Sequence, residues 1–122
     1  MEGTRSVIID ASAIVAIFSR RDQWHTAALP LLTRLPKPFV TCEAVLSEAC
    51  FLLGSLGVKQ LFEFIRRDLL RIDFSLTSEA ENAALLMEKY SDVPMSLADA
   101  CLVRMSEMAS ESSVFTFDGD FQ

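Results

Sequence analysis

The chain has 122 residues, of which 51% are hydrophobic and 23% charged, so its composition fits one globular domain and excludes a disordered chain. The net charge of −6 argues against a protein that coats DNA, although a cluster of metal-binding carboxylates would account for several negative charges. No apolar stretch approaches the roughly 18 residues of a membrane span, and the N-terminus lacks signal-peptide features, so we expect a cytoplasmic protein without membrane association.

The first 41 residues predict two strands and two helices. A short apolar run at 7–10 predicts a buried strand, and the apolar residues of 11–18 predict a helix with Ser12 as its N-cap. A second helix is expected over 23–35, where Pro30 predicts a kink or break. Residues 39–41 are then expected to form a second strand.

The middle of the chain predicts two more helices and a strand. Residues 43–53 are expected to form a helix that Gly54 ends as a C-cap, and 58–67 form another with one apolar face. The alternation of apolar and polar residues over 70–76 predicts a half-buried strand at a sheet edge.

The remaining residues predict two helices, a strand and a turn. Helices are expected over 77–90, with Ser78 and Glu81 as a capping box, and over 96–110, with Ser96 and Asp99 in the same roles. The last strand is expected over 114–117, directly before a turn at 118–120.

Strands that alternate with helices predict parallel pairing and right-handed crossovers. We therefore expect one domain over residues 1–122 with an α/β fold, a three-layer α/β/α sandwich around a mostly parallel sheet of about four strands. Ligands of such sheets bind beyond the carboxyl ends of the strands. Asp10 ends the first strand and Asp118 follows the last, so both carboxylates should reach the same sheet edge.

Glu48 is the acid whose surroundings are least expected for a charged side chain. Helical spacing places it on a face with Val45, Phe51 and Leu52, so we expect it to be buried with a partner rather than to lie on a solvated stripe. A metal ion would serve as that partner. Glu43, one turn earlier, is better explained as a favourable charge at the helix start.

The other acids each have a purely structural alternative. Asp10 could act only as a helix N-cap, and Asp99 only as part of its capping box. Asp118 and Asp120 could form only a solvated turn. Together, acids at strand ends and on otherwise apolar helices favour a site for a hard cation, Mg²⁺ or Mn²⁺, that activates water for phosphodiester hydrolysis.

The cysteines and the single histidine exclude other metal chemistry. Cys42, Cys50 and Cys101 include no CxxC pair, which argues against a disulfide framework or a structural zinc site, and we expect them to act as small buried hydrophobic residues. With His25 alone, zinc held by several imidazoles is excluded.

At these positions the chain resembles the PIN domain family, and within it the VapC-like toxin ribonucleases of bacterial toxin–antitoxin pairs. The resemblance rests on four motifs in the family's order: Val7-Ile8-Ile9-Asp10-Ala11-Ser12-Ala13, Thr41-x-x-x-Val45-x-x-Glu48, Tyr90-x-Asp92-x-Pro94-Met95-Ser96-Leu97-Ala98-Asp99-Ala100 and Thr116-Phe117-Asp118-x-x-Phe121. Each motif alone is weak, but their order and spacing over nearly the whole chain are specific.

The resemblance implies a site and an activity. Asp10, Glu48, Asp99 and Asp118 would be the acidic quartet that holds Mg²⁺ and carries out catalysis. Ser12 and Thr116 would support the site by hydrogen bonds, with assistance from Asp120. The activity would be hydrolysis of RNA by a homodimeric toxin, silenced by a cognate antitoxin that covers the site and extends an Arg or Lys to the carboxylates.

Three features depart from the family pattern. Ala11 stands where many members have Thr, and Ser96 stands where related members often have a further Asp. The sequence also ends at Gln122, where the family usually continues into a last strand, so we expect that strand to be missing.

Two other functions compete with the nuclease. One is a catalytically silent PIN-like module that binds a protein through its apolar helices. The other is phosphoryl transfer through an aspartyl phosphate at Asp10, which ranks last because Ser12 replaces the second Asp and no lysine follows the last strand. Substrate-binding residues are not identified; among basic candidates, Arg20 and Arg21 would be tested first, before Lys37, Lys59, Arg66, Arg67 and Arg71.

Overall fold

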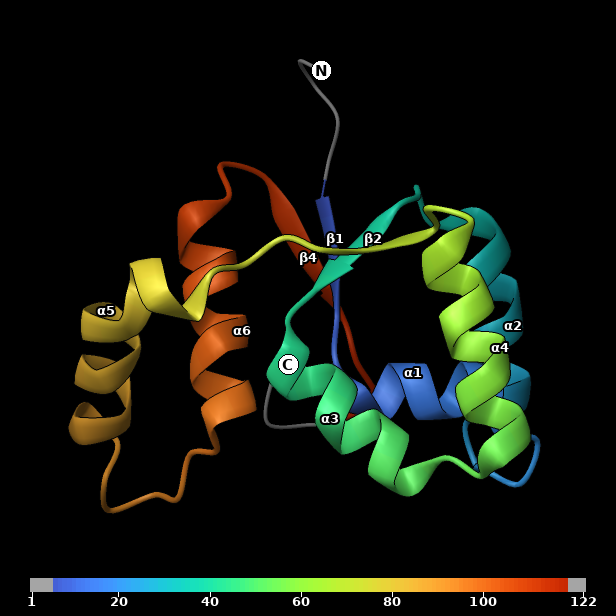
Figure 1. Ribbon diagram of the computed structural model, residues 1–122, viewed down its shortest axis with the longest axis horizontal. Helices are drawn as coiled ribbons and strands as arrows, with labels where there is room; N and C mark the ends of the chain where they lie inside the picture. The colour runs from blue at the N-terminus through green and yellow to red at the C-terminus, as the bar shows by residue number, and fades with distance from the viewer. Residues whose placement is uncertain (1–5, 119–122) are drawn as a thin grey trace.

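The computed structural model describes residues 6–118, which form six helices and four strands. Figure 1 shows the helices arranged around a small sheet. The elements in chain order are β1 (Ser6–Ile9), α1 (Ala11–Phe18), α2 (His25–Arg34), β2 (Phe39–Thr41), α3 (Glu43–Leu52), α4 (Ser55–Arg66), β3 (Leu70–Ile72), α5 (Leu76–Lys89), α6 (Leu97–Met108) and β4 (Ser112–Phe115).

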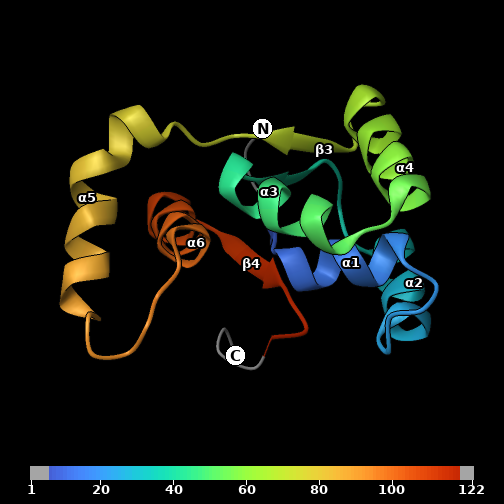
Figure 2. The ribbon, with the colours of Figure 1, turned by 60° about the horizontal axis from the view of Figure 1, so that its bottom comes forward.

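The four strands form one parallel sheet in the order β3-β2-β1-β4. Ile8 of β1 pairs with Val40 of β2 on one side and with Val114 of β4 on the other. In both views α1 to α4 lie on one side of the sheet and α5 and α6 on the other (Figures 1 and 2). The predicted three-layer α/β/α sandwich with a parallel sheet is therefore confirmed, and β3 is an edge strand as expected.

The core forms where β1 meets α1. Val7, Ile8 and Ile9 are each 1% exposed, because helices cover both faces of this central strand. Ala13 and Ile14 of α1 are fully buried, and Phe39 of β2 packs against the same cluster. This packing fixes the end of β1, and with it the position of Asp10, relative to α1.

Several helix boundaries differ from the predicted ones. Gly54 does not end α3, whose C-cap is Leu53; instead it is the N-cap of α4, which begins three residues earlier than expected. The N-cap of α5 is Ser75, whose hydroxyl accepts from the Ser78 amide, so the predicted Ser78–Glu81 capping box is wrong. Pro30 lies inside α2 and does not end it.

The strands and the first helix also need correction. β3 stops at Ile72 and not at Leu76, which already belongs to α5. β4 begins two residues before the predicted strand and ends at Phe115. The N-cap of α1 is Asp10, not Ser12. Both residues can cap a helix, but the end of β1 leaves Asp10 in the extended conformation that an N-cap requires.

The prediction that the cysteines are buried is confirmed for two of the three. Cys42 and Cys101 are buried and Cys50 is half-buried, and all three are free thiols. Burial is the main cause that raises the pKa of Cys42 to about 11, so this thiol is protonated at neutral pH. Across residues 6–118, no helix has the length and apolar character needed to cross a membrane.

Candidate active site

Asp10 is a buried carboxylate at the carboxyl end of β1, with only 4% of its surface exposed. Its Oδ1 accepts hydrogen bonds from the Ser12 hydroxyl at 2.8 Å and from the Ala13 amide at 3.0 Å. Its Oδ2 accepts a hydrogen bond from the Thr116 hydroxyl. The capping function and the site position are thus compatible, because Oδ2 accepts from a single donor and still has a lone pair to offer a ligand, whereas Oδ1 already accepts from two donors.

Ser12 and Thr116 join the ends of β1 and β4 into one unit. The Ser12 hydroxyl accepts from the Phe117 amide at 2.8 Å while it donates to Asp10. The Thr116 hydroxyl accepts from the Asp118 amide at 2.8 Å while it donates to Asp10. The two hydroxyl oxygens are 3.4 Å apart. Each hydroxyl therefore links the Asp10 carboxylate to the backbone of the segment that follows β4.

Glu48 lies on α3, and its predicted burial is wrong. The side chain is exposed, and the same outer side of α3 carries Ser47, Phe51 at 88% exposure and Leu52 at 64%. Helical spacing alone does not reveal which side of an apolar helix its neighbours cover; Val45 and Ala49 are the residues that face the core. An exposed glutamate does not need a partner to be tolerated there.

Glu48 is nevertheless coupled electrostatically to two other acids of the predicted quartet. Its pKa is raised above the usual value, first by partial loss of hydration and then by the negative charges of Asp99 and Asp10. These three residues come from α3, α6 and the end of β1. Carboxylates that are distant in sequence thus repel one another here, which an additional cation would relieve.

Asp99 has the helix-capping function that the sequence predicted. The Ser96 hydroxyl accepts from the Asp99 amide at 3.0 Å, and the Asp99 carboxylate accepts from the Ser96 amide at 3.3 Å, so the capping box of α6 is confirmed. The side chain is half-buried, although its neighbours in sequence, Ala98 and Ala100, are both buried. Its charge also acts on Glu48, so the cap does not remove Asp99 from the acidic cluster.

Asp118 follows β4 by three residues and is exposed. Its amide is bound by the Thr116 hydroxyl, which in turn contacts Asp10, so its backbone is held beside the buried acid. Asp120 and the predicted turn at 118–120 lie outside the described residues, except for Asp118 itself.

The donor set fits a hard divalent cation in its chemistry, because every acid of the cluster supplies carboxylate oxygens. Within residues 6–118, however, no three Asp, Glu, His or Cys side chains are close enough together to hold an ion in their present rotamers. Asp10 is fixed by its three donors, whereas Glu48 is exposed and can change rotamer at little cost. If these acids bind one ion, Glu48 would therefore have to move more than Asp10.

An aromatic pair beside the acids was missed by the sequence analysis. The rings of Trp24 and Phe117 are stacked, with centroids 5.3 Å apart and an interplanar angle of 6°. Phe117 is the residue whose amide binds Ser12. The two aromatic residues are 93 positions apart, so no local pattern signals the contact; only the position of Phe117 inside the fourth motif pointed to this region.

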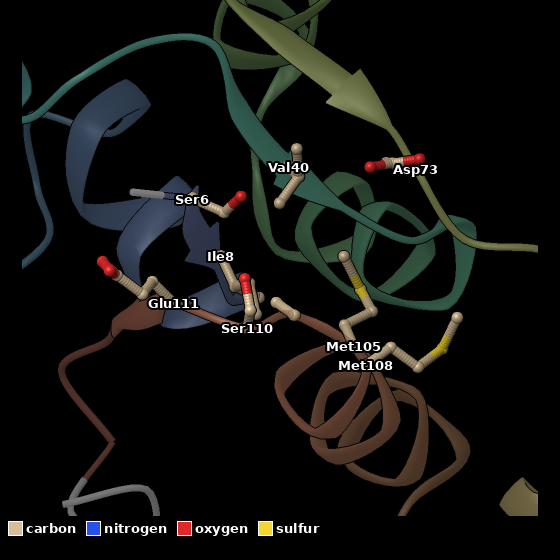
Figure 3. A pocket seen from close by; sticks show the side chains of 9 residues that line it. Ser6, Ile8, Val40, Asp73, Met105, Met108, Ser110 and Glu111 are labelled. Carbon is tan, nitrogen blue, oxygen red and sulfur yellow. The ribbon is translucent and has the colours of Figure 1, made fainter. Parts of the chain in front are cut away.

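The other polar regions of the structure are built differently. A cavity of about 350 Å³ beside β1 and α6 has an apolar floor that includes Ile8 and Met105, with the acids Asp73 and Glu111 at its edges (Figure 3). Of the basic candidates, Arg66 and Arg67 pair with Glu63, and Arg71 pairs with Asp68. Arg20 and Arg21 are exposed and form no ion pair within residues 6–118.

Comparison with known proteins identifies the family. Residues 7–122 match the PIN domain, so the chain belongs to the PIN domain family. The fold is similar to that in a crystal structure of Mycobacterium tuberculosis VapC20, which is described as a toxin that cleaves the sarcin–ricin loop. The two chains share 24% sequence identity and a TM-score of 0.82, over 95% of this chain and 92% of VapC20. A search among curated proteins gives no match.

Proposed function

We propose that this PIN domain protein is a metal-dependent endoribonuclease that hydrolyses phosphodiester bonds of RNA at the Asp10 end of the sheet. The observation that carries the proposal is the arrangement around Asp10, a buried carboxylate held by three donors, with the charges of Glu48 and Asp99 close enough to interact. Membership of the PIN domain family supports it, because proteins of this family generally depend on a divalent metal.

Asp10, Glu48, Asp99 and Asp118 would hold the metal, which we propose to be Mg²⁺, with Mn²⁺ as a substitute. When bound, such an ion supplies Lewis-acid stabilisation of the phosphate and lowers the pKa of a bound water. The ion would also relieve the repulsion that raises the pKa of Glu48.

The chain's own residues would orient the reaction. Asp10 is anchored by Ser12, Thr116 and the Ala13 amide, so its oxygens point in a fixed direction before any ligand arrives. Glu48 is exposed beside this fixed acid, and in a closed site its carboxylate would be placed to accept a proton from the attacking water. Ser12 and Thr116 are positioning residues in this proposal, and Asp120 would assist from the following segment.

We also propose that the protein is the toxin of a toxin–antitoxin pair and acts in the cytoplasm as a homodimer. The similar fold of VapC20, itself a toxin, supports the first part. Phe51 and Leu52 form an exposed apolar surface next to Glu48, which suits a protein segment that covers the site. A basic side chain from an antitoxin would neutralise the acids, so co-purification from the native host should recover a basic partner.

The exposed apolar side of α3 also favours a second candidate, a catalytically silent module that binds a protein partner there. The two candidates differ in their dependence on metal. A silent module predicts no thermal shift with Mg²⁺ or Mn²⁺ and no cleavage of any RNA.

The test is cleavage of a pool of single-stranded and structured RNAs with Mg²⁺ or Mn²⁺, with and without a chelator. We expect metal-dependent cleavage by the wild type and a loss of about 100-fold or more in Asp10→Asn and Asp99→Asn. Asp73→Asn, an exposed acid outside the site, should cleave like the wild type. Undiminished cleavage by both Asp10→Asn and Asp99→Asn would overturn the assignment of these residues.

A further inference from the structure

Trp24 lies at the start of α2 and is 43% exposed, although one face of its ring is covered by Phe117. Because the nearly parallel ring of Phe117 covers one face, a ligand that stacks on the indole must use the opposite face. Large aromatic side chains are usually buried more completely, and an exposed one adds to the cost of hydrating apolar surface. Exposure alone does not distinguish Trp24, because Phe51 and Phe62 are more exposed; what distinguishes it is the stack on Phe117, which joins it to the segment that holds Asp10.

The ring of Trp24 is held in place by a series of aromatic contacts that reaches the core. Phe117 packs edge-to-face on Phe115 with centroids 5.8 Å apart, and Phe115 packs edge-to-face on the fully buried Phe39 at 6.0 Å. The Trp24 amide also donates to the Asp22 carboxylate at 3.0 Å. A ring fixed in this way loses little conformational entropy when a ligand stacks on it.

The same contacts join Trp24 to the acidic site. Phe117 lies between Thr116, whose hydroxyl binds Asp10, and Asp118. The Phe117 amide donates to the Ser12 hydroxyl, which also binds Asp10. A planar group that stacks on the free face of Trp24 would be separated from Phe117 by the indole ring, and its position would be set by the same segment that holds Asp10.

We propose that the exposed face of Trp24 is a stacking platform for one unpaired base of the RNA substrate, which it holds beside the scissile phosphate. The inference rests on the proposed nuclease function and adds the side chain that would bind the substrate, which must then present a base that is free to unstack. Bases inside an A-form duplex already have both faces covered, whereas unpaired bases stack readily on aromatic side chains.

The charge distribution is consistent with this substrate. Arg20 and Arg21, without ion pairs inside the described part of the chain, precede Trp24 in the loop between α1 and α2. Stacking is independent of charge, so it offers a net-acidic protein a way to bind RNA at the acidic site that does not depend on phosphate contacts alone. Trp24 would be a specificity-determining residue and not a catalytic one.

The test uses the intrinsic fluorescence of the protein, because Trp24 is the only tryptophan in the chain. The wild type is titrated with single-stranded oligoadenylate in the presence of a chelator, which prevents cleavage, and then with a duplex of oligoadenylate and oligouridylate. We expect saturable quenching and a spectral shift with the single strand and little change with the duplex. Equal responses to both, or no response to saturating single strand, would overturn the proposal.

Variants provide the second readout, with affinity measured by anisotropy of a labelled oligoadenylate. Trp24→Ala should weaken binding about 5- to 150-fold, and Trp24→Phe should restore most of the affinity because it keeps an aromatic face. Phe62→Ala is the matched control: Phe62 is 52% exposed on α4, outside the aromatic series, and its removal should leave affinity unchanged. Equal loss in Trp24→Ala and Phe62→Ala would contradict a specific platform.

The failure of this inference and the failure of the nuclease proposal are distinguishable. If RNA is cleaved with metal, the Trp24→Ala protein should show a raised KM with kcat nearly unchanged; cleavage with unaltered KM would reject the platform and leave the nuclease intact. Quenching of Trp24 by single-stranded RNA without any cleavage would support the platform and reject the nuclease. Quenching by a basic peptide in place of RNA would show that the exposed ring serves a protein partner, and would overturn the proposal.

Discussion

Asp10 and Glu48 bring carboxylates to one region of the sheet edge, but the protein surrounds them in opposite ways. Asp10 is buried and accepts three hydrogen bonds, two from hydroxyls and one from a backbone amide. Glu48 is exposed, forms no hydrogen bond inside residues 6–118, and is coupled to Asp99 and Asp10 by charge alone. Asp10 therefore contributes hydrogen bonds that stabilise the fold, whereas Glu48 interacts with the other acids only through its charge.

Replacement of Asp10 and replacement of Glu48 should therefore affect activity and stability differently. Loss of Asp10 affects the helix cap, the hydroxyl network and the proposed activity together. Loss of Glu48 affects the activity and the charge balance, but it should leave the fold intact or more stable. Four predictions follow this contrast from the largest expected effect to the smallest.

Replacement of Asp10 by Ala should lower the rate of RNA cleavage about 100-fold or more and also lower the free energy of unfolding. The lost N-cap alone costs about 0.5–2 kcal/mol, and the Ser12 and Thr116 hydroxyls lose their acceptor. Glu48→Ala should lower the cleavage rate by a similar factor without lowering the free energy of unfolding. Urea unfolding measures the stability of both variants, and cleavage assays measure their activity. Equal destabilisation by the two substitutions would contradict the proposed difference between Asp10 and Glu48.

Replacement of Ser12 by Ala should lower activity about 10- to 100-fold, because Asp10 loses an orienting donor and the Phe117 amide loses its acceptor. Thr41→Val is a matched control, since the buried Thr41 hydroxyl donates to the Ile9 carbonyl at 2.8 Å but does not contact Asp10. Both variants should be destabilised by about 1–3 kcal/mol. Only Ser12→Ala should lose activity beyond its loss of folded protein, as single-turnover cleavage rates would show.

Mg²⁺ or Mn²⁺ should stabilise the wild type by about 1.4 kcal/mol at a concentration ten times its Kd, which corresponds to a rise in Tm of several degrees. At the same metal concentration, the rise should nearly vanish in Glu48→Gln, because loss of one carboxylate weakens metal affinity. Differential scanning fluorimetry with and without metal measures it. An equal rise in both proteins would remove Glu48 from the site.

The smallest effect concerns pH in the absence of metal. The pKa of Glu48 is raised in the folded state, so protonation of Glu48 favours folding. This contribution to the free energy of unfolding is lost as pH rises through the raised pKa. Glu48→Gln should therefore be more stable than the wild type at neutral pH, by only about 1–2 °C in Tm since the side chain is exposed and screened. Below about pH 4 the difference should disappear. A difference of opposite sign would exclude repulsion at this site.

Much of the fold followed from local patterns in the sequence. The apolar run at 7–10 predicted β1, and the alternation of strands and helices predicted the parallel sheet and the location of Asp10 at its edge. The capping box of Ser96 and Asp99 was also predicted correctly. These features depend on neighbours within four residues or on a general rule of topology.

The features that were missed depend on contacts between distant segments. Glu48 was expected to be buried because α3 is apolar on most sides, but neighbouring elements cover only the side that carries Val45 and Ala49. Gly54 was expected to end α3, but it caps the start of α4 because the two helices follow one another directly. The stacking of Trp24 on Phe117 depends on how the loop after α1 packs against the segment after β4.

The central claim is that four acids, Asp10 after β1, Glu48 on α3, Asp99 on α6 and Asp118 after β4, hold one divalent-metal site. A crystal of the protein soaked with Mn²⁺ tests it most directly, because anomalous scattering locates the ion independently of any assumed ligand. We predict an ion bound by carboxylate oxygens of Asp10, Glu48, Asp99 and Asp118, directly at about 2.1 Å or through a water, with Glu48 in a rotamer turned toward Asp10. Manganese bound elsewhere, with Asp10 contacting only Ser12, Ala13 and Thr116, would contradict the account.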